Sequence, residues 1–135
     1  MSFISWSDEM SVQVEEIDQQ HQQLVQILND FYDSMQVGKS DDILMKILDD
    51  LFCYARQHFA TEEKYFKKFG YPETEEHMEE HAKFKNTVFE FVNDLNAGKI
   101  GLSFSILDFL KQWLYSHIMD TDKKYASFFN EKGLK

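Results

Sequence analysis

The chain has 135 residues, with 14 Lys and Arg against 24 Asp and Glu, which gives a formal net charge of −10. The length suits one domain with its own core. The negative charge excludes a nucleic-acid partner, because it opposes binding to phosphates. No apolar run approaches the roughly 20 residues of a membrane span, and the first ten residues show no basic region followed by an apolar segment, so no signal peptide is expected. Cys53 is the single cysteine, so no internal disulfide forms and a cytoplasmic protein is expected.

Four amphipathic helices are predicted from the apolar spacing and from the positions of glycine and proline. Residues 1–17, which include Trp6 and Val12, are expected to form an arm packed on the bundle. The single proline and four of the five glycines fall in three clusters, at 38–40, 70–72 and 96–101. The helices between them are predicted at about 18–37, 41–69, 73–96 and 103–130. Short connections make successive helices antiparallel, so the fold class is all-α, an up-down-up-down four-helix bundle forming one domain over residues 1–135.

All five histidines fall on the apolar faces of these helices. The second helix also carries a carboxylate, Glu62, four residues after His58. The other histidines are His21, His77, His81 and His117. The antiparallel arrangement brings all five to the same end of the bundle. The acidic residues around the pair on the third helix are expected to face solvent: Glu75, Glu76, Glu79 and Glu80.

A buried metal site explains this polar layer better than ordinary core packing does. One histidine on an apolar face is usually a hydrogen-bonded core residue. Five buried imidazoles each need a polar partner, however, and Glu62 needs a counter-charge that no Lys or Arg on these faces supplies. A metal cation meets all of these needs together.

The fourth helix is expected to supply Asp122 as a further ligand. Asp122 follows His117 by five residues, or about 140° further around a regular α-helix. A one-residue π-bulge between them would bring the two side chains together. Alternatively, the inward stripe runs through Leu114, Ile118 and Asp122, and His117 approaches from its flank. The sequence leaves both alternatives open.

With these residues in place, the chain resembles the bacterial hemerythrins over essentially its whole length. The resemblance rests on Trp6 in the arm and on the motifs IDQQH (17–21), HFATE (58–62), HMEEH (77–81) and HIMDTD (117–122). It implies a non-haem di-iron centre. One iron would be held by His77, His81 and His117, and the other by His21 and His58. Glu62 and Asp122 would bridge the two irons together with an oxo or hydroxo group.

A count of ligands indicates where dioxygen would bind. Two six-coordinate irons have about twelve positions, and the ligands above fill all but one, on the iron with two histidines. No Glu-x-x-His motif of the oxygen-activating di-iron proteins occurs, which favours reversible dioxygen binding for storage, delivery or scavenging. The walls of the open position are expected to include Leu24, Leu28, Phe59, Trp113 and Leu114. Each of these is equally consistent with core packing.

Three other functions fit the same residues less well. An oxygen or redox sensor acting through a partner protein would need an output surface or domain, and the chain ends soon after its fourth helix. An enzyme that handles peroxide or nitric oxide would need an acid/base pair, whereas all five histidines are used as ligands. A structural zinc site needs about four ligands, so seven are too many. Dioxygen is therefore the expected partner, and no enzymatic activity is expected.

Overall fold

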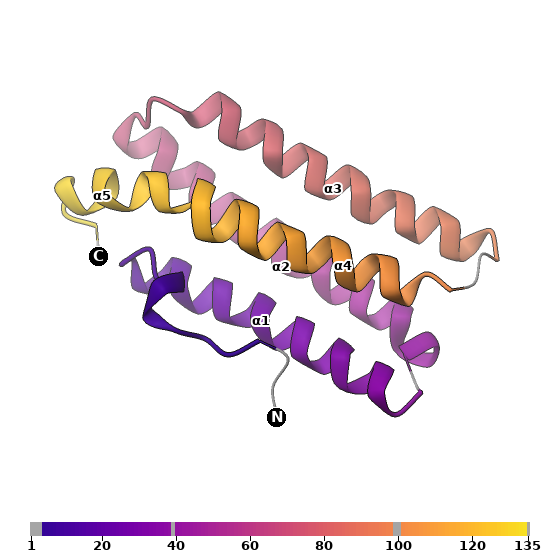
Figure 1. Ribbon diagram of the computed structural model, residues 1–135. Coiled ribbons are helices and arrows are strands. Elements are labelled where there is room, and N and C mark those ends of the chain that lie inside the picture. The colour runs from indigo at the N-terminus through magenta and orange to yellow at the C-terminus, as the bar shows by residue number, and fades with distance from the viewer. Residues whose placement is uncertain (1–3, 39, 99–100, 135) are drawn as a thin grey trace.

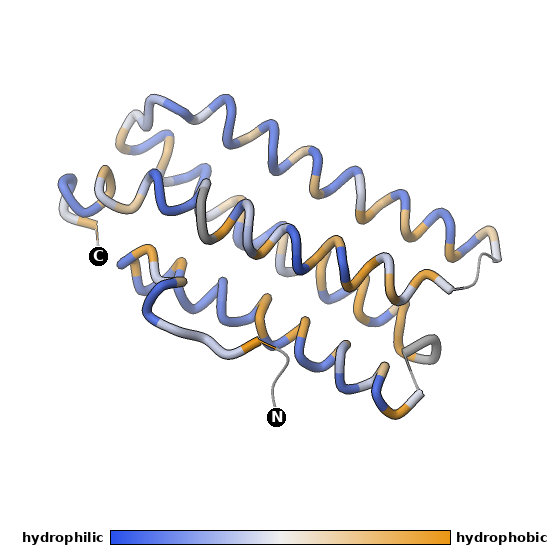
Figure 2. Tube along the Cα trace, in the orientation of Figure 1, coloured by the Kyte–Doolittle hydropathy of each residue, from blue (hydrophilic) through white to orange (hydrophobic). Residues whose placement is uncertain are grey.

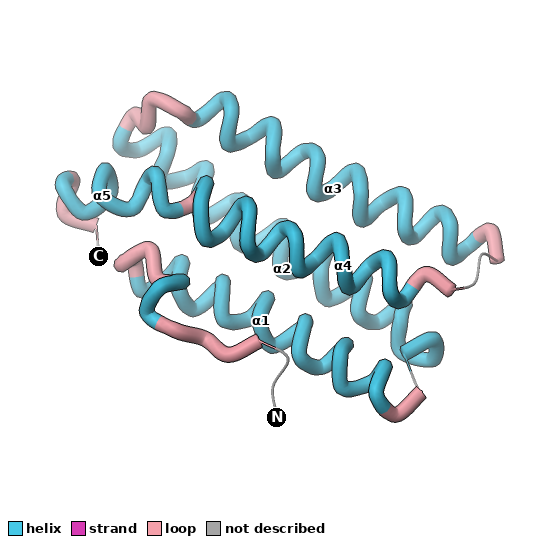
Figure 3. Tube along the Cα trace, in the orientation of Figure 1, coloured by secondary structure: helices cyan, strands magenta, loops and turns pink. Residues whose placement is uncertain are grey.

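The computed structural model describes residues 4–38, 40–98 and 101–134, and these form helices joined by short loops (Figures 1 and 3). No strand occurs among these residues. The helical elements after the arm are α1 (Glu15–Gln36), α2 (Ser40–Phe69), α3 (Thr74–Asn96), α4 (Ser103–Trp113), η2 (Leu114–Thr121) and α5 (Lys123–Glu131). In Figure 1, α4 and α5 follow one another along a single rod, which lies beside α1, α2 and α3. The predicted all-α four-helix bundle is confirmed.

The N-terminal arm packs on the bundle and contains one short 3-10 helix, η1 (Asp8–Met10). The carboxylate of Asp18 accepts hydrogen bonds from the Ser11 hydroxyl at 2.5 Å and from the Val12 backbone N–H at 2.9 Å. Val12 is fully buried, and Trp6 packs against the core. This anchoring lets α1 begin at Glu15, three residues before the sequence-based start at 18.

The apolar core has two parts. The larger part fills the middle of the bundle and includes Leu24, Phe59, Phe84 and Leu114. The smaller part is formed by the arm, the start of α1, the end of α2 with the turn that follows it, and α5. It consists of Val12, Val14, Ile17, Phe66, Tyr71, Tyr125 and Phe129. Figure 2 shows apolar and polar residues alternating along each helix, as in amphipathic helices that bury one face. The polar layer therefore interrupts the core between its two parts.

The end of α2 depends on a glycine. Gly70 has a φ of +68°, in the left-handed region that favours glycine. Its N–H donates to the Phe66 carbonyl at 2.8 Å, and the N–H of Tyr71 donates to the same carbonyl at 3.1 Å. Tyr71 can then turn into the smaller part of the core.

Gly70→Ala is expected to destabilise the protein by about 1–2 kcal/mol. A Cβ at this position meets no neighbouring atom within 4 Å, so the cost comes from the left-handed backbone itself. Urea denaturation of both proteins measures the difference. Equal unfolding midpoints would contradict this account of the turn.

None of the helices in the described ranges combines the length and the apolar character that crossing a bilayer requires.

Candidate metal centre

The structure brings all seven predicted ligands together in one buried layer. They come from all four rods of the bundle: α1 carries one, α2 and α3 carry two each, and η2 and the residue that follows it carry the last two. None is more than 2% exposed. These residues are His21, His58, Glu62, His77, His81, His117 and Asp122.

Their ligand atoms form two adjoining groups. One group contains Glu62, His77, His81 and His117, and the other contains His21, His58 and Asp122. Within each group the candidate ligand atoms lie within 4.8 Å of one another. We call them the three-histidine group and the two-histidine group.

Each carboxylate lies between the two groups. Glu62 Oε1 is 3.0 Å from Nε2 of both His58 and His81. Asp122 Oδ1 is 2.8 Å from His77 Nε2 and 2.9 Å from His117 Nε2, and its Oδ2 is 3.0 Å from His21 Nε2. The two carboxylates are therefore placed to contact ions in both groups.

These separations fit metal coordination. Neighbouring ligand atoms on an octahedral ion with bonds of about 2.1 Å lie about 3 Å apart. Four of the buried atoms make no hydrogen bond within the described part of the chain, although they are this close to one another. They are Glu62 Oε2, His77 Nε2, His117 Nε2 and Asp122 Oδ1. Buried atoms that approach one another this closely without hydrogen-bond geometry suit a shared cation.

The electrostatics of the layer also favour cations. Burial lowers the pKa of His58 and His77, but the carboxylates of Glu62 and Asp122 outweigh it and raise these pKa values to about 9 and about 10. The pKa of His21 is lowered, because its burial outweighs the attraction of Asp122. Burial and mutual repulsion raise the pKa of Glu62, but the histidines hold it and the pKa of Asp122 well below their usual range. The carboxylates therefore favour positive charge in the layer, which metal ions would supply.

The last two predicted ligands are brought together by a π-helix. The segment η2 is π-helical from Leu114 to Thr121, and the Asp122 N–H donates to the His117 carbonyl five residues earlier at 2.7 Å. A π-helical turn contains more residues than an α-helical turn, so His117 and Asp122, five residues apart, lie on nearly the same face of this segment. Of the two arrangements that the sequence left open, the structure shows the π-helical one. Leu114, Ile118 and Asp122 are also fully buried.

The residues expected to line a dioxygen pocket all lie in the larger part of the core. Leu24, Leu28 and Leu114 are fully buried there. Phe59 stacks on the His81 ring with centroids 3.8 Å apart, and Trp113 stacks on the His117 ring at 3.9 Å. Both stacks are made with the three-histidine group, whereas the open position was expected beside the two-histidine group. The pocket lining stays a prediction.

Three polar side chains near the ligands were missed by sequence reasoning. Gln20 Oε1 lies 2.7 Å from His58 Nδ1, and Glu63 Oε2 lies 3.3 Å from His81 Nδ1. Glu80 Oε1 lies 3.2 Å from His117 Nδ1. The expectation that Glu80 faces solvent was only partly right, because its side chain is 35% exposed but also reaches across to His117 on the neighbouring rod. The only sequence signal was that each of the three is adjacent to a predicted ligand.

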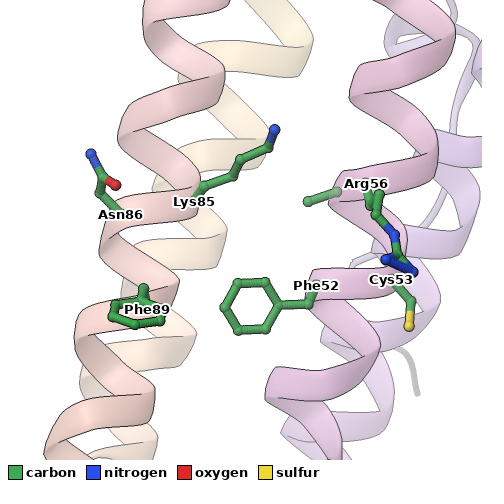
Figure 4. A pocket seen from close by; sticks show the side chains of 7 residues that line it. Phe52, Cys53, Arg56, Lys85, Asn86 and Phe89 are labelled. Carbon is green, nitrogen blue, oxygen red and sulfur yellow. The ribbon is translucent and has the colours of Figure 1, made fainter.

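A surface groove between α2 and α3 lies near the site without being part of it. It has a volume of about 530 Å³. Figure 4 shows Phe52 on α2 pointing toward the helix that carries Lys85 and Phe89. Lys85 Nζ is 5.6 Å from the centre of the Phe59 ring, which in turn stacks on His81. Phe59 does not line the groove itself, but it contacts both Lys85, which does, and the ring of His81.

Fold and site define a class of protein: an antiparallel four-helix bundle whose helices enclose a buried histidine and carboxylate site suited to metal cations. The chain belongs to the hemerythrin HHE cation binding domain family, which matches residues 12–129. The suspected relation to the hemerythrins is confirmed.

Relatives and solved structures agree with this assignment. A bacteriohemerythrin of Clostridium acetobutylicum is 32% identical over 125 residues, covering 89% of this chain and 96% of that protein. A bacteriohemerythrin of Stenotrophomonas maltophilia is 29% identical over 93% of this chain and 81% of its own length. The crystal structure of a wild-type hemerythrin superposes with a TM-score of 0.84 at 28% identity, covering 93% of this chain and 97% of the other.

Proposed function

We propose that this protein binds dioxygen reversibly at a non-haem di-iron centre, for storage, delivery or scavenging. The observation that carries the proposal is the pair of adjoining ligand groups, five histidines and two carboxylates buried in one layer. Membership of the hemerythrin family supports it.

The ligands would be divided between the two ions as the two groups suggest. His77, His81 and His117 would hold one iron, and His21 and His58 the other. Glu62 and Asp122 would bridge the irons together with an oxo or hydroxo group. The bridging role is supported by the short distances from Glu62 Oε1 to His58 and His81, one from each group.

The chain contributes orientation and protection from water. In the bound site the two iron ions would supply the electrons and the coordination position for dioxygen. The imidazoles would hold the ions through Nε2, and the Phe59 and Trp113 rings stack on two of them and hold their planes. Leu24 and Leu114 exclude water, since both are fully buried. Neutral imidazoles stabilise highly oxidised iron less than carboxylates do, which favours binding of dioxygen over its further chemistry.

Metal analysis and optical spectroscopy test the proposal. The purified protein should contain about two irons per chain, the number that a shared pair of bridging carboxylates implies. The anaerobically reduced protein should be colourless, gain near-ultraviolet and visible bands in air, and lose them when oxygen is removed. Bands that only a reductant can reverse would reject reversible binding and favour redox sensing or peroxide chemistry.

A further inference from the structure

The outward-facing nitrogens of the histidines have unequal partners. In the three-histidine group, Nδ1 of His81 faces Glu63 at 3.3 Å and Nδ1 of His117 faces Glu80 at 3.2 Å. In the two-histidine group, Nδ1 of His58 faces the neutral amide of Gln20 at 2.7 Å. His21 Nδ1 has no partner within the described residues.

These contacts set the tautomers of His58, His81 and His117. An imidazole that binds a cation through Nε2 carries its proton on Nδ1 and donates it outward. An ionised carboxylate has no proton to donate and can only accept hydrogen bonds, so it suits an Nδ1–H donor. The side chains of Glu63 and Glu80 are 34% and 35% exposed, so water can solvate their negative charge.

A threonine lies beside an acceptor in each group, and Thr61 orients Gln20. The Thr61 hydroxyl donates to the Gln57 carbonyl at 3.0 Å and accepts from Gln20 Nε2 at 2.9 Å. This leaves the amide oxygen of Gln20 facing His58. At the other group, the Thr121 hydroxyl lies 3.3 Å from the Ser116 carbonyl and 3.4 Å from Glu80 Oε1, so its proton is shared between two acceptors. Thr121 is the last residue of the π-helical segment, so this segment places both His117 and Thr121 beside Glu80.

An anionic acceptor changes the ligand as well as its orientation. A carboxylate that accepts the Nδ1 proton makes the imidazole more basic and a stronger donor to the metal, whereas an amide does so less. Stronger donation favours the more highly charged ion. Two of the histidines in the three-histidine group have a carboxylate beside Nδ1, and neither histidine in the two-histidine group does.

We propose that Glu63 and Glu80 are positioning residues that make the two metal positions unequal. The ion in the three-histidine group binds more tightly and is oxidised at a lower potential than the ion in the two-histidine group. Gln20 orients His58 without adding charge. The inference rests on the proposed two-metal site and deepens it by naming the side chains that set the difference.

The test compares three isosteric variants of the full chain, Glu63→Gln, Glu80→Gln and Glu79→Gln. Glu79 is exposed on α3, and its replacement is the control because it removes the same charge. Calorimetric titration of the metal-free proteins with Zn²⁺ measures affinity without redox chemistry. Each of the first two variants should lose about 10- to 100-fold in the tighter binding step, the usual cost of removing such a partner. The control should change neither step.

The second readout is the midpoint potential of the iron-loaded proteins. It should rise in Glu63→Gln and Glu80→Gln relative to Glu79→Gln, and rise further in the double variant. A merely structural role for the two glutamates would lower stability without moving the potential. Gln20→Glu is the converse change and should lower the potential.

Affinities and potentials equal to those of Glu79→Gln would overturn the inference, as would equal losses in both binding steps. The outcome is separable from that of the proposed function. If the wild-type protein failed to bind dioxygen but the Zn²⁺ affinities differed as expected, the function would be rejected and the unequal metal positions would stand.

Discussion

Replacing Asp122 by asparagine is expected to remove metal from the protein and to lower its thermal stability sharply. Asp122 Oδ1 is within 2.9 Å of Nε2 of both His77 and His117, and Oδ2 is 3.0 Å from His21 Nε2. An amide of the same shape has one oxygen and no negative charge, so it cannot serve both groups. Removing a hydrogen-bond partner of a metal ligand lowers the metal affinity by about 10- to 100-fold, so removing a ligand shared by both ions should lower it by more than about 100-fold.

The thermal effect follows from linkage between metal binding and folding. A hundredfold loss of affinity removes about 2.7 kcal/mol of stabilisation at metal concentrations well above the dissociation constant. For a chain of this size that corresponds to a fall of about 10 °C in the midpoint of the loaded protein. Metal analysis and calorimetry measure both effects. Asp108→Asn, which removes an exposed carboxylate from α4, is the control. Full metal loading of Asp122→Asn would show that this residue is not a shared ligand.

Phe59→Ala is expected to have the second large effect, on stability and on the rate of oxidation in air. The Phe59 ring is 1% exposed, stacks on His81, and contacts Phe84 and Trp113 edge-on at 5.6 and 6.1 Å. Removing a buried phenyl ring costs about 3–5 kcal/mol. The change should also open the groove between α2 and α3 to the histidines, so that water reaches the site and the reduced iron-loaded protein oxidises faster.

Phe89→Ala is the matched control for this prediction. Phe89 lines the same groove but is 57% exposed, so its loss should cost under about 1 kcal/mol. Phe59→Leu keeps most of the apolar volume and should fold well while still losing the stack on His81. Urea denaturation and stopped-flow absorbance in air give the two readouts. Oxidation of both Phe59 variants at the wild-type rate would show that the ring does not shield the histidines.

The fold was predictable because the sequence carries two kinds of signal for the helices, apolar spacing and glycines at helix ends. The apolar spacing along each segment marks an inward face, and Gly38, Gly70 and Gly98 mark the ends of α1, α2 and α3. The start of α1 was less predictable. It depends on Asp18 reaching back to Ser11 and Val12, and such a contact leaves no periodic trace.

The gathering of the candidate ligands was predictable for a related reason. Histidines on the apolar faces of all four helices of an antiparallel bundle meet in its interior. The partners of the ligands were not predictable. Helical spacing gives the direction of a Cα–Cβ bond, whereas Glu80 reaches His117 through a long side chain whose backbone position faces partly outward. The π-helix was one of two alternatives. The five-residue interval between His117 and Asp122 shows that a regular α-helix would point the two side chains in different directions, but it does not show which backbone conformation brings them together.

The most direct test of the di-iron account is anomalous diffraction at the iron absorption edge from crystals of the iron-loaded protein. The account predicts two peaks in the polar layer, one beside His77, His81 and His117 and one beside His21 and His58, with Glu62 and Asp122 contacting both. A single peak, or a second peak outside this layer, would contradict it.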